Sequence, residues 1–210
     1  MFDGNFRKSV DARTAPVGQQ LVKVGVSADV LTSLGLLFAT ATALAIGSGH
    51  HWWAIVLLTL TGASDLLDGP VAKASQTASV RGSFFDSVVD RISDGVLLGG
   101  VAYFLISHHR GVWILLPFAL MTVTFMISYE RSKAESLGLD AKGGLMERAE
   151  RMIALGLALI SQTTFLPALT VLFFLTLGTA VGRFLRVWRQ ATALTSGTEP
   201  RRRSSRPSRR

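Results

Sequence analysis

Long apolar blocks separated by short polar loops restrict the fold of this sequence more than any other feature. The blocks cover residues 30–46, 52–63, 96–106, 112–127, 152–160 and 166–181. With their weakly polar flanks, several reach the roughly 20 residues that a helix needs to cross a bilayer. Because lipid cannot satisfy free backbone polar groups, the sequence predicts an all-α integral membrane bundle. Six transmembrane helices are expected, near residues 28–48, 51–74, 82–107, 111–134, 147–162 and 165–190.

Two basic segments flank the expected six-helix domain, which we place at residues 28–190. Residues 1–27 lack the apolar core of a cleavable signal peptide and predict a cytoplasmic, interfacial amphipathic helix. Residues 191–210 end in EPRRRSSRPSRR, which contains no apolar residue to bury. That segment predicts a disordered, basic cytoplasmic tail close to anionic lipid headgroups.

The positions of Lys and Arg predict the orientation in the membrane. Of the 22 basic residues, 20 fall on one side of the expected bundle, while the opposite loops SGHH, SHHRG and SQTTFLPA contain only Arg110. The positive-inside rule therefore places both termini in the cytoplasm of a multi-pass plasma-membrane protein. Much of the net charge of +8 lies in the terminal tail. We therefore expect membrane lipids as partners and no nucleic acid.

The stretch SDLLDGPVAKASQTASVRGSFFDSVVDRISDG, residues 64–95, contains five of the 14 acidic residues. Ionisable groups inside membrane helices are costly and indicate function. Asp65 and Asp68 are three residues apart, and Asp86 and Asp90 are four apart, so each pair shares one helical face. The expected helix ends place all four carboxylates at one level, just below the cytoplasmic surface.

Four carboxylates this close repel one another unless cations lie between them. Oxygen ligands suit Mg²⁺, Mn²⁺ or Ca²⁺, and four carboxylates can hold two such ions around a transferring phosphoryl group. Gly69 and Gly82 leave room for a ligand, and Lys73 and Arg81 can contact its phosphates.

Simple charge pairing inside the bundle and a cation path through a transporter are the alternatives for the acidic stretch. Only Arg91 is available within the expected spans to pair with the aspartates. The outward ends of the two helices, HHWWAIVLL and GVLLGGVAYFLI, are apolar, whereas a cation path would need polar groups across the full membrane depth. Both alternatives are therefore weaker than a metal site.

The acidic stretch resembles the signature of the CDP-alcohol phosphotransferase family, D-x2-D-G-x2-A-R-x8-G-x3-D-x3-D. Every position matches except Lys73, where the family has arginine. The resemblance implies that an acceptor hydroxyl attacks the lipid-linked phosphorus of a CDP-alcohol and that CMP leaves. It implies two divalent cations, Mg²⁺ or Mn²⁺, with Asp90 as the base. The implied metal ligands are Asp65, Asp68, Asp86 and Asp90, and the implied CDP-binding residues include Gly69, Ala72, Lys73 and Gly82.

Basic residues in the second half of the chain indicate a phosphate on the acceptor. They lie in SYERSKAESLGLDAKGGLMERAERM and GRFLRVWR, at the cytoplasmic ends of the last three expected helices. The alternative is ordinary positive-inside charge. The candidate acceptor-phosphate ligands are Arg131, Lys133, Arg148, Arg151 and Arg183.

Several segments resemble the actinobacterial phosphatidylinositol-phosphate synthases: ISYERSKAESLG, ERAER, DRISDG and GVSADVLTSLG. In the last segment, Asp29 and Thr32 are then expected to face the nucleotide. The order of Arg131 and Lys133, and Ala149 in place of the usual proline, depart from that group. Asp94 lies outside the signature, and we expect a structural role beside Arg91.

The leading interpretation is synthesis of phosphatidylinositol phosphate from CDP-diacylglycerol and inositol 1-phosphate. Phosphatidylglycerophosphate synthesis, with glycerol 3-phosphate in the same basic pocket, is the alternative. The family resemblance also implies a homodimer.

Overall fold

The computed structural model describes the backbone of residues 5–195 and the side chains of residues 13–195, and every regular element in this part is helical. The predicted tail therefore lies mostly outside the described residues. The elements in chain order are α1 Asn5–Lys23, α2 Ala28–Gly47, α3 His51–Ala74, α4 Val80–Ser107, the 3₁₀ turn η1 Gly111–Ile114, α5 Leu115–Ser136, α6 Arg148–Ala158 and α7 Gln162–Thr195.

The predicted all-α class is confirmed, and the helices begin and end close to their predicted positions. Helix α7 runs on through residues 191–195, which the sequence had placed in the tail. Within the described part of the chain, four segments are long and apolar enough to cross a membrane, namely α2, α3, Gly111–Ser136 and α7.

The count of six spans is not confirmed. Helix α4 has 28 residues, but it carries four charged residues between Asp86 and Asp94. Helix α6 has only 11 residues where the sequence predicted a span over 147–162. Its length is about 16 Å, roughly half the thickness of a bilayer core.

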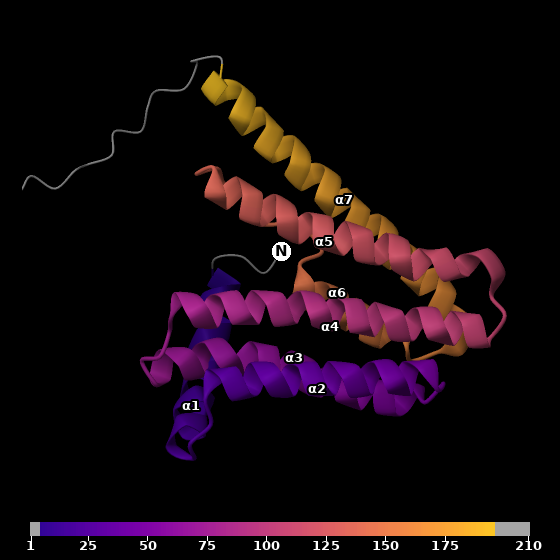
Figure 1. Ribbon diagram of the computed structural model, residues 1–210, viewed down its shortest axis with the longest axis horizontal. Helices are drawn as coiled ribbons and strands as arrows, with labels where there is room; N and C mark the ends of the chain where they lie inside the picture. Colours follow the sequence, from indigo (N-terminus) through magenta and orange to yellow (C-terminus); the bar gives the residue numbers. More distant parts are fainter. Residues whose placement is uncertain (1–4, 196–210) are drawn as a thin grey trace, which may run out of the picture.

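Helix α2 is the centre of one half of the bundle, because it packs against both α3 and α4 (Figure 1). Helix α5 packs against α4 and α7, while α6 packs against α3 and α7. Helix α1 crosses one end of α3, where Gly18 allows the two backbones to meet at Pro70. The buried apolar core joins α2, α3 and α4 to α6 and α7 through residues such as Ile46, Leu58, Val101, Leu159 and Leu169.

Serine caps fix the starts of the two helices that border the candidate site. Ser27 accepts a hydrogen bond from the backbone N–H of Val30 at the start of α2, and Ser79 accepts one from Gly82 at the start of α4. Such caps satisfy backbone donors that the first helical turn leaves free. Only residues 75–79 separate α3 from α4, so the acidic end of α3 and the acidic start of α4 lie at the same end of the bundle.

Gly100 permits the closest approach of α4 to α2. A Cβ atom at this position would lie 2.5 Å from the carbonyl oxygen of Ala43, a backbone atom that cannot rotate away. At the neighbouring Gly99, an added Cβ meets nothing within 4 Å.

We therefore expect Gly100→Ala to lower the free energy of unfolding by about 1–3 kcal/mol, the usual cost of overpacking. Gly99→Ala is the matched control and should leave stability unchanged or slightly raised, since alanine favours helix. Thermal unfolding in detergent, followed by tryptophan fluorescence, measures both. Equal midpoints for the two variants would contradict the close α2–α4 contact.

Candidate active site

The aspartates of the signature line the space that α3 and α4 share with α2. Asp86 of α4 lies within electrostatic range of both Asp65 and Asp68 of α3. The hydroxyl of Thr32 in α2 donates to Asp68 Oδ2 at 3.3 Å. On the same face of α2, Gly35 leaves room for Asp65, because a Cβ there would lie 3.2 Å from Asp65 Oδ1. Helix α2 thus contacts Asp65 and Asp68 directly.

The guanidinium of Arg148, from the start of α6, lies among these carboxylates. Its Nη2 is 2.9 Å from Asp65 Oδ2, its Nη1 contacts Asp90 Oδ1, and its Nε is 3.6 Å from Asp94 Oδ1. The Arg148 side chain is only 15% exposed. One basic side chain therefore joins acidic residues of α3 and α4 across the site.

The carboxylates surround this guanidinium instead of converging on one point. Within residues 13–195, no group of three or more acidic, histidine or cysteine side chains is close enough to hold a metal ion. The residues nevertheless fit a hard cation. The donor set is entirely carboxylate oxygen, and Asp65 Oδ2 is buried without a hydrogen-bond partner. The proposed metal ligands thus remain a prediction.

A cavity of about 510 Å³ opens beside the carboxylates, between the starts of α2 and α4 and the end of α3. All six residues that the sequence predicted for the nucleotide line it, together with Asp68, Asp86, Ser27, Ser79 and Arg81. The six are Asp29, Thr32, Gly69, Ala72, Lys73 and Gly82. An added Cβ at Gly69 would meet nothing within 4 Å, so the backbone there borders open space.

One ion pair crosses the mouth of this cavity. Arg81 Nη2 donates to Asp29 Oδ2 at 3.3 Å, and both side chains are well exposed. Exposed pairs of this kind contribute little to stability. Both side chains are therefore available to a ligand at small cost.

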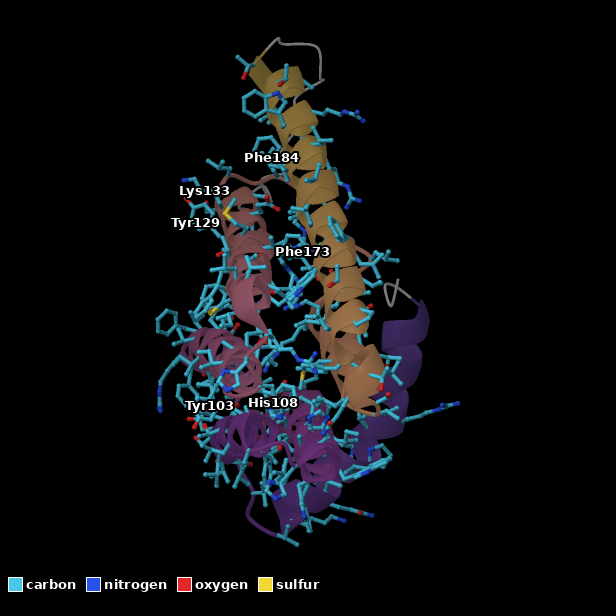
Figure 2. All side chains as sticks on the ribbon, turned by 90° about the vertical axis from the view of Figure 1, so that its right-hand side faces the viewer. Tyr103, His108, Tyr129, Lys133, Phe173 and Phe184 are labelled. Atoms are coloured by element: carbon cyan, nitrogen blue, oxygen red, sulfur yellow. The ribbon has the colours of Figure 1, made fainter. Side chains whose placement is uncertain are left out.

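The five candidate acceptor ligands do not form one cluster. Lys133 is exposed and lies on the side of α5 that faces away from α7 (Figure 2). Arg131 pairs with Glu135 one turn further along α5, at 3.0 Å. Arg148 lies among the aspartates, as described above.

Arg151 and Arg183 are buried and already hydrogen-bonded. Arg151 donates to Asp94 Oδ2 at 3.2 Å and to the carbonyl of Met146 at 3.1 Å. Arg183 of α7 donates to the carbonyls of Ile127 and Gly143 and pairs with Glu147. Arg183 therefore ties α5 and the segment before α6 to α7.

The pairing of Asp94 differs from the sequence-based expectation. Asp94 is buried and contacts Arg151 and Arg148, whereas Arg91 pairs with Asp90 at 3.3 Å. The contacts of Asp94 are consistent with a structural role. Its partners are Arg148 and Arg151 of α6, which lie 54 and 57 positions further along the chain. The available signal was the spacing of Arg148 and Arg151, which places both on one face at the start of a helix whose remainder, after Arg151, is apolar.

Solved structures of other proteins share this fold. A *Mycobacterium tuberculosis* phosphatidylinositol phosphate synthase with CDP-DAG bound superposes with a TM-score of 0.75 at 27% identity, covering 83% of this chain and 93% of that one. A second structure of that synthase, in complex with manganese and citrate, has the same TM-score and identity and covers 88% of that chain.

Curated relatives agree with the structural likeness. A phosphatidylinositol phosphate synthase of *Corynebacterium glutamicum* is 35% identical over 70% of this chain and 68% of its own length. An archaetidylinositol phosphate synthase of *Methanothermobacter thermautotrophicus* is 32% identical over 80% of this chain and 86% of its own. The family model for CDP-alcohol phosphatidyltransferase matches residues 26–194, which include the aspartates, the cavity and α6. The chain therefore belongs to the CDP-alcohol phosphatidyltransferase family.

Proposed function

We propose that this protein transfers a phosphatidyl group from CDP-diacylglycerol to inositol 1-phosphate, releasing CMP and forming phosphatidylinositol phosphate. The observation that carries the proposal is the cavity of about 510 Å³, which six predicted nucleotide-binding residues line beside Asp68 and Asp86. The relatives named above, which carry the name of phosphatidylinositol or archaetidylinositol phosphate synthase, support the reaction.

The cavity is suited to the cytidine diphosphate part of the donor. Gly69 and Gly82 allow the nucleotide to approach the backbone, and Thr32 offers a hydroxyl beside Asp68. Lys73 and Arg81 supply positive charge to the diphosphate. The family's arginine offers a planar fork to phosphate, whereas the lysine ammonium acts as a point charge on a flexible side chain. Lys73 would therefore hold the diphosphate less rigidly.

We assign the binding of divalent metal, Mg²⁺ or Mn²⁺, to Asp65, Asp68, Asp86 and Asp90. Two bound ions would neutralise the diphosphate charge and favour CMP as the leaving group. The all-carboxylate donor set supports this assignment, as does Asp65 Oδ2, which is buried without a hydrogen bond. Manganese in the related mycobacterial structure supports it as well.

Asp90 is the proposed general base. It would take the proton of the acceptor hydroxyl while that oxygen forms a bond to the lipid-linked phosphorus and the bond from this phosphorus to CMP breaks. The proton ends on Asp90 and the electron pair leaves with CMP. Asp90 is suited to this step because it lies one turn beyond Asp86 on the face of α4 that borders the site.

The acceptor phosphate is assigned to the basic residues of α5, α6 and α7. Arg131 lies within electrostatic range of Arg183, and Arg148 and Arg151 begin α6 beside the aspartates. Lys133 completes the set at the exposed end of α5. Glycerol 3-phosphate would need the same charges, but the named relatives favour the inositol phosphate.

We place the protein in the plasma membrane with its active site and both termini on the cytoplasmic side. In this arrangement the chain crosses the bilayer six times, through α2, α3, α4, α5, the short α6 and α7, and the even number leaves both termini on one side. Helix α1 lies at the interface beside α3, residues 28–190 form the catalytic domain, and the protein acts as a homodimer. The four apolar candidate spans and the excess of Lys and Arg at one end support the topology.

A direct test is CMP release by purified protein with CDP-diacylglycerol and Mg²⁺. Inositol 1-phosphate, glycerol 3-phosphate, free inositol and serine are compared as acceptors. We expect release with inositol 1-phosphate, at least about 100-fold less with free inositol and serine, which lack the phosphate, and clearly less with glycerol 3-phosphate, which lacks the inositol ring. Preferential CMP release with glycerol 3-phosphate would support the proposed transfer reaction but contradict inositol 1-phosphate as the acceptor.

Asp90→Asn should reduce the transfer rate by at least about 100-fold, within the usual range for a general base. The folded protein should still bind CDP-diacylglycerol, because the nucleotide cavity is lined by other residues. Single-turnover CMP release and donor binding are measured on the same preparation. A variant with wild-type turnover would remove Asp90 as the base.

Gly69→Leu should raise the donor KM about tenfold or more without lowering stability, because its side chain enters the open nucleotide cavity. Gly178→Leu is the matched control, since an added Cβ there also meets nothing within 4 Å and Gly178 lies in α7, away from the cavity. Steady-state kinetics with varied donor measure the effect. An unchanged donor KM in Gly69→Leu would exclude this cavity as the nucleotide site.

A further inference from the structure

Arg148 differs from the other charged groups because its guanidinium lies between two of the proposed metal ligands, Asp65 and Asp90. Its guanidinium contacts Asp65 of α3 and Asp90 of α4, and it reaches Asp94 one turn further along α4. Asp65 and Asp90 are two of the four carboxylates to which we assigned the divalent ions. A guanidinium and a divalent cation repel each other, so both cannot neutralise the same carboxylates at once.

The contacts of Arg148 lack good hydrogen-bond geometry. Its Nε lies 3.6 Å from Asp94 Oδ1, too far for a hydrogen bond, and its Nη2 is 2.9 Å from Asp65 Oδ2 without hydrogen-bond alignment. Arg151, one turn later on α6, is different, because it forms hydrogen bonds to Asp94 and to the carbonyl of Met146. A buried ion pair without satisfied hydrogen bonds repays little of its desolvation cost. Arg148 is therefore held by charge and is open to replacement by a better cation.

One existing contact of Arg148 does not involve the proposed metal ligands. Asp94 is outside the family signature, is buried, and lies 3.6 Å from Arg148 Nε. Asp94 can keep one contact with Arg148 while Asp65 and Asp90 turn to a metal ion. The bond of Arg151 to Asp94 holds the start of α6 against α4 throughout.

We propose that Arg148 is the internal counter-ion of the metal-free site and that divalent metal ions bind by displacing it. This inference rests on the proposed assignment of the metal to Asp65, Asp68, Asp86 and Asp90. The exchange has a functional consequence, because Arg148 contacts Asp90 Oδ1. Metal loading thus uncovers the proposed base and, in the same movement, releases a basic group of the acceptor-phosphate set.

The test measures Mn²⁺ affinity by isothermal titration calorimetry of the full-length protein in detergent, without substrates. Arg148→Gln should bind Mn²⁺ about tenfold or more tightly than wild type, because no buried ion pair has to be broken first. Its melting temperature should be lower than that of wild type in EDTA, where the aspartates lose their counter-ion. Saturating Mn²⁺ should restore most of that loss, since a ligand of the folded state stabilises it.

Arg91→Gln is the matched control. It removes the same charge and one contact to Asp90 at 3.3 Å, but Arg91 does not bridge the two helices. Its effect on Mn²⁺ affinity should be clearly smaller than that of Arg148→Gln. An equal gain in Mn²⁺ affinity in both variants would mean that removal of any nearby positive charge has this effect. That result would overturn the proposed exchange.

Other outcomes are also decisive. Unchanged or weaker Mn²⁺ binding in Arg148→Gln would overturn the exchange and leave the metal site intact. Absence of Mn²⁺ binding in the wild-type protein would overturn the metal assignment itself, so the two failures are distinguishable.

A measurement on the wild-type chain keeps the test valid if Arg148→Gln does not fold. Phenylglyoxal labelling of arginines, read by peptide mass spectrometry, should modify Arg148 several-fold faster in Mn²⁺ than in EDTA. Arg151 is the internal control and should react equally in both, because its bonds to Asp94 and Met146 do not involve the metal ligands. Equal labelling of Arg148 in the two conditions would contradict the displacement.

Discussion

Carboxylates inside an otherwise apolar bundle must be neutralised, and this requirement determines where α6 lies against α3 and α4. Asp65, Asp90 and Asp94 meet their opposite charges in Arg148 and Arg151, which begin the short helix α6. Removing one partner of such a network leaves an uncompensated buried charge, at a cost of about 3–5 kcal/mol. The position of α6 against α3 and α7 is therefore fixed by charge at its start and by apolar packing at its end.

The same arrangement explains why the site lies at one end of the bundle. Ser27 and Ser79 begin α2 and α4 beside the end of α3, so backbone and small side chains border the nucleotide cavity there. The apolar contacts of Ile46, Leu58 and Val101 fill the other end. Carboxylates, glycines and the basic residues Lys73, Arg81 and Arg148 thus share one region, whereas Arg131, Lys133 and Arg183 do not belong to this cluster.

The residues that line the cavity lie in three short stretches of sequence, and the family signature and the resemblance of GVSADVLTSLG singled out six of them. Asp68, Gly69 and Lys73 share the end of one helix, and the five-residue loop after it determines where Gly82 lies. The pairing of Asp94 with Arg151 could not be predicted, since it joins residues 57 positions apart. Arg148 and Arg151 also fit the positive-inside rule. Their sequence positions therefore gave no sign that they pair with aspartates inside the bundle. The short length of α6 could not be predicted either. Apolar residues continue to Ile160, although the helix ends at Ala158.

In the proposed mechanism the carboxylates of α3 and α4 hold divalent cations and exchange Arg148 for them. Anomalous diffraction from crystals grown with Mn²⁺ tests it most directly, because the signal locates the metal and the electron density locates the side chain. The account predicts anomalous peaks among Asp65, Asp68, Asp86 and Asp90, with the Arg148 guanidinium withdrawn toward Asp94. Metal bound elsewhere, or Arg148 still between Asp65 and Asp90 beside a bound ion, would contradict it.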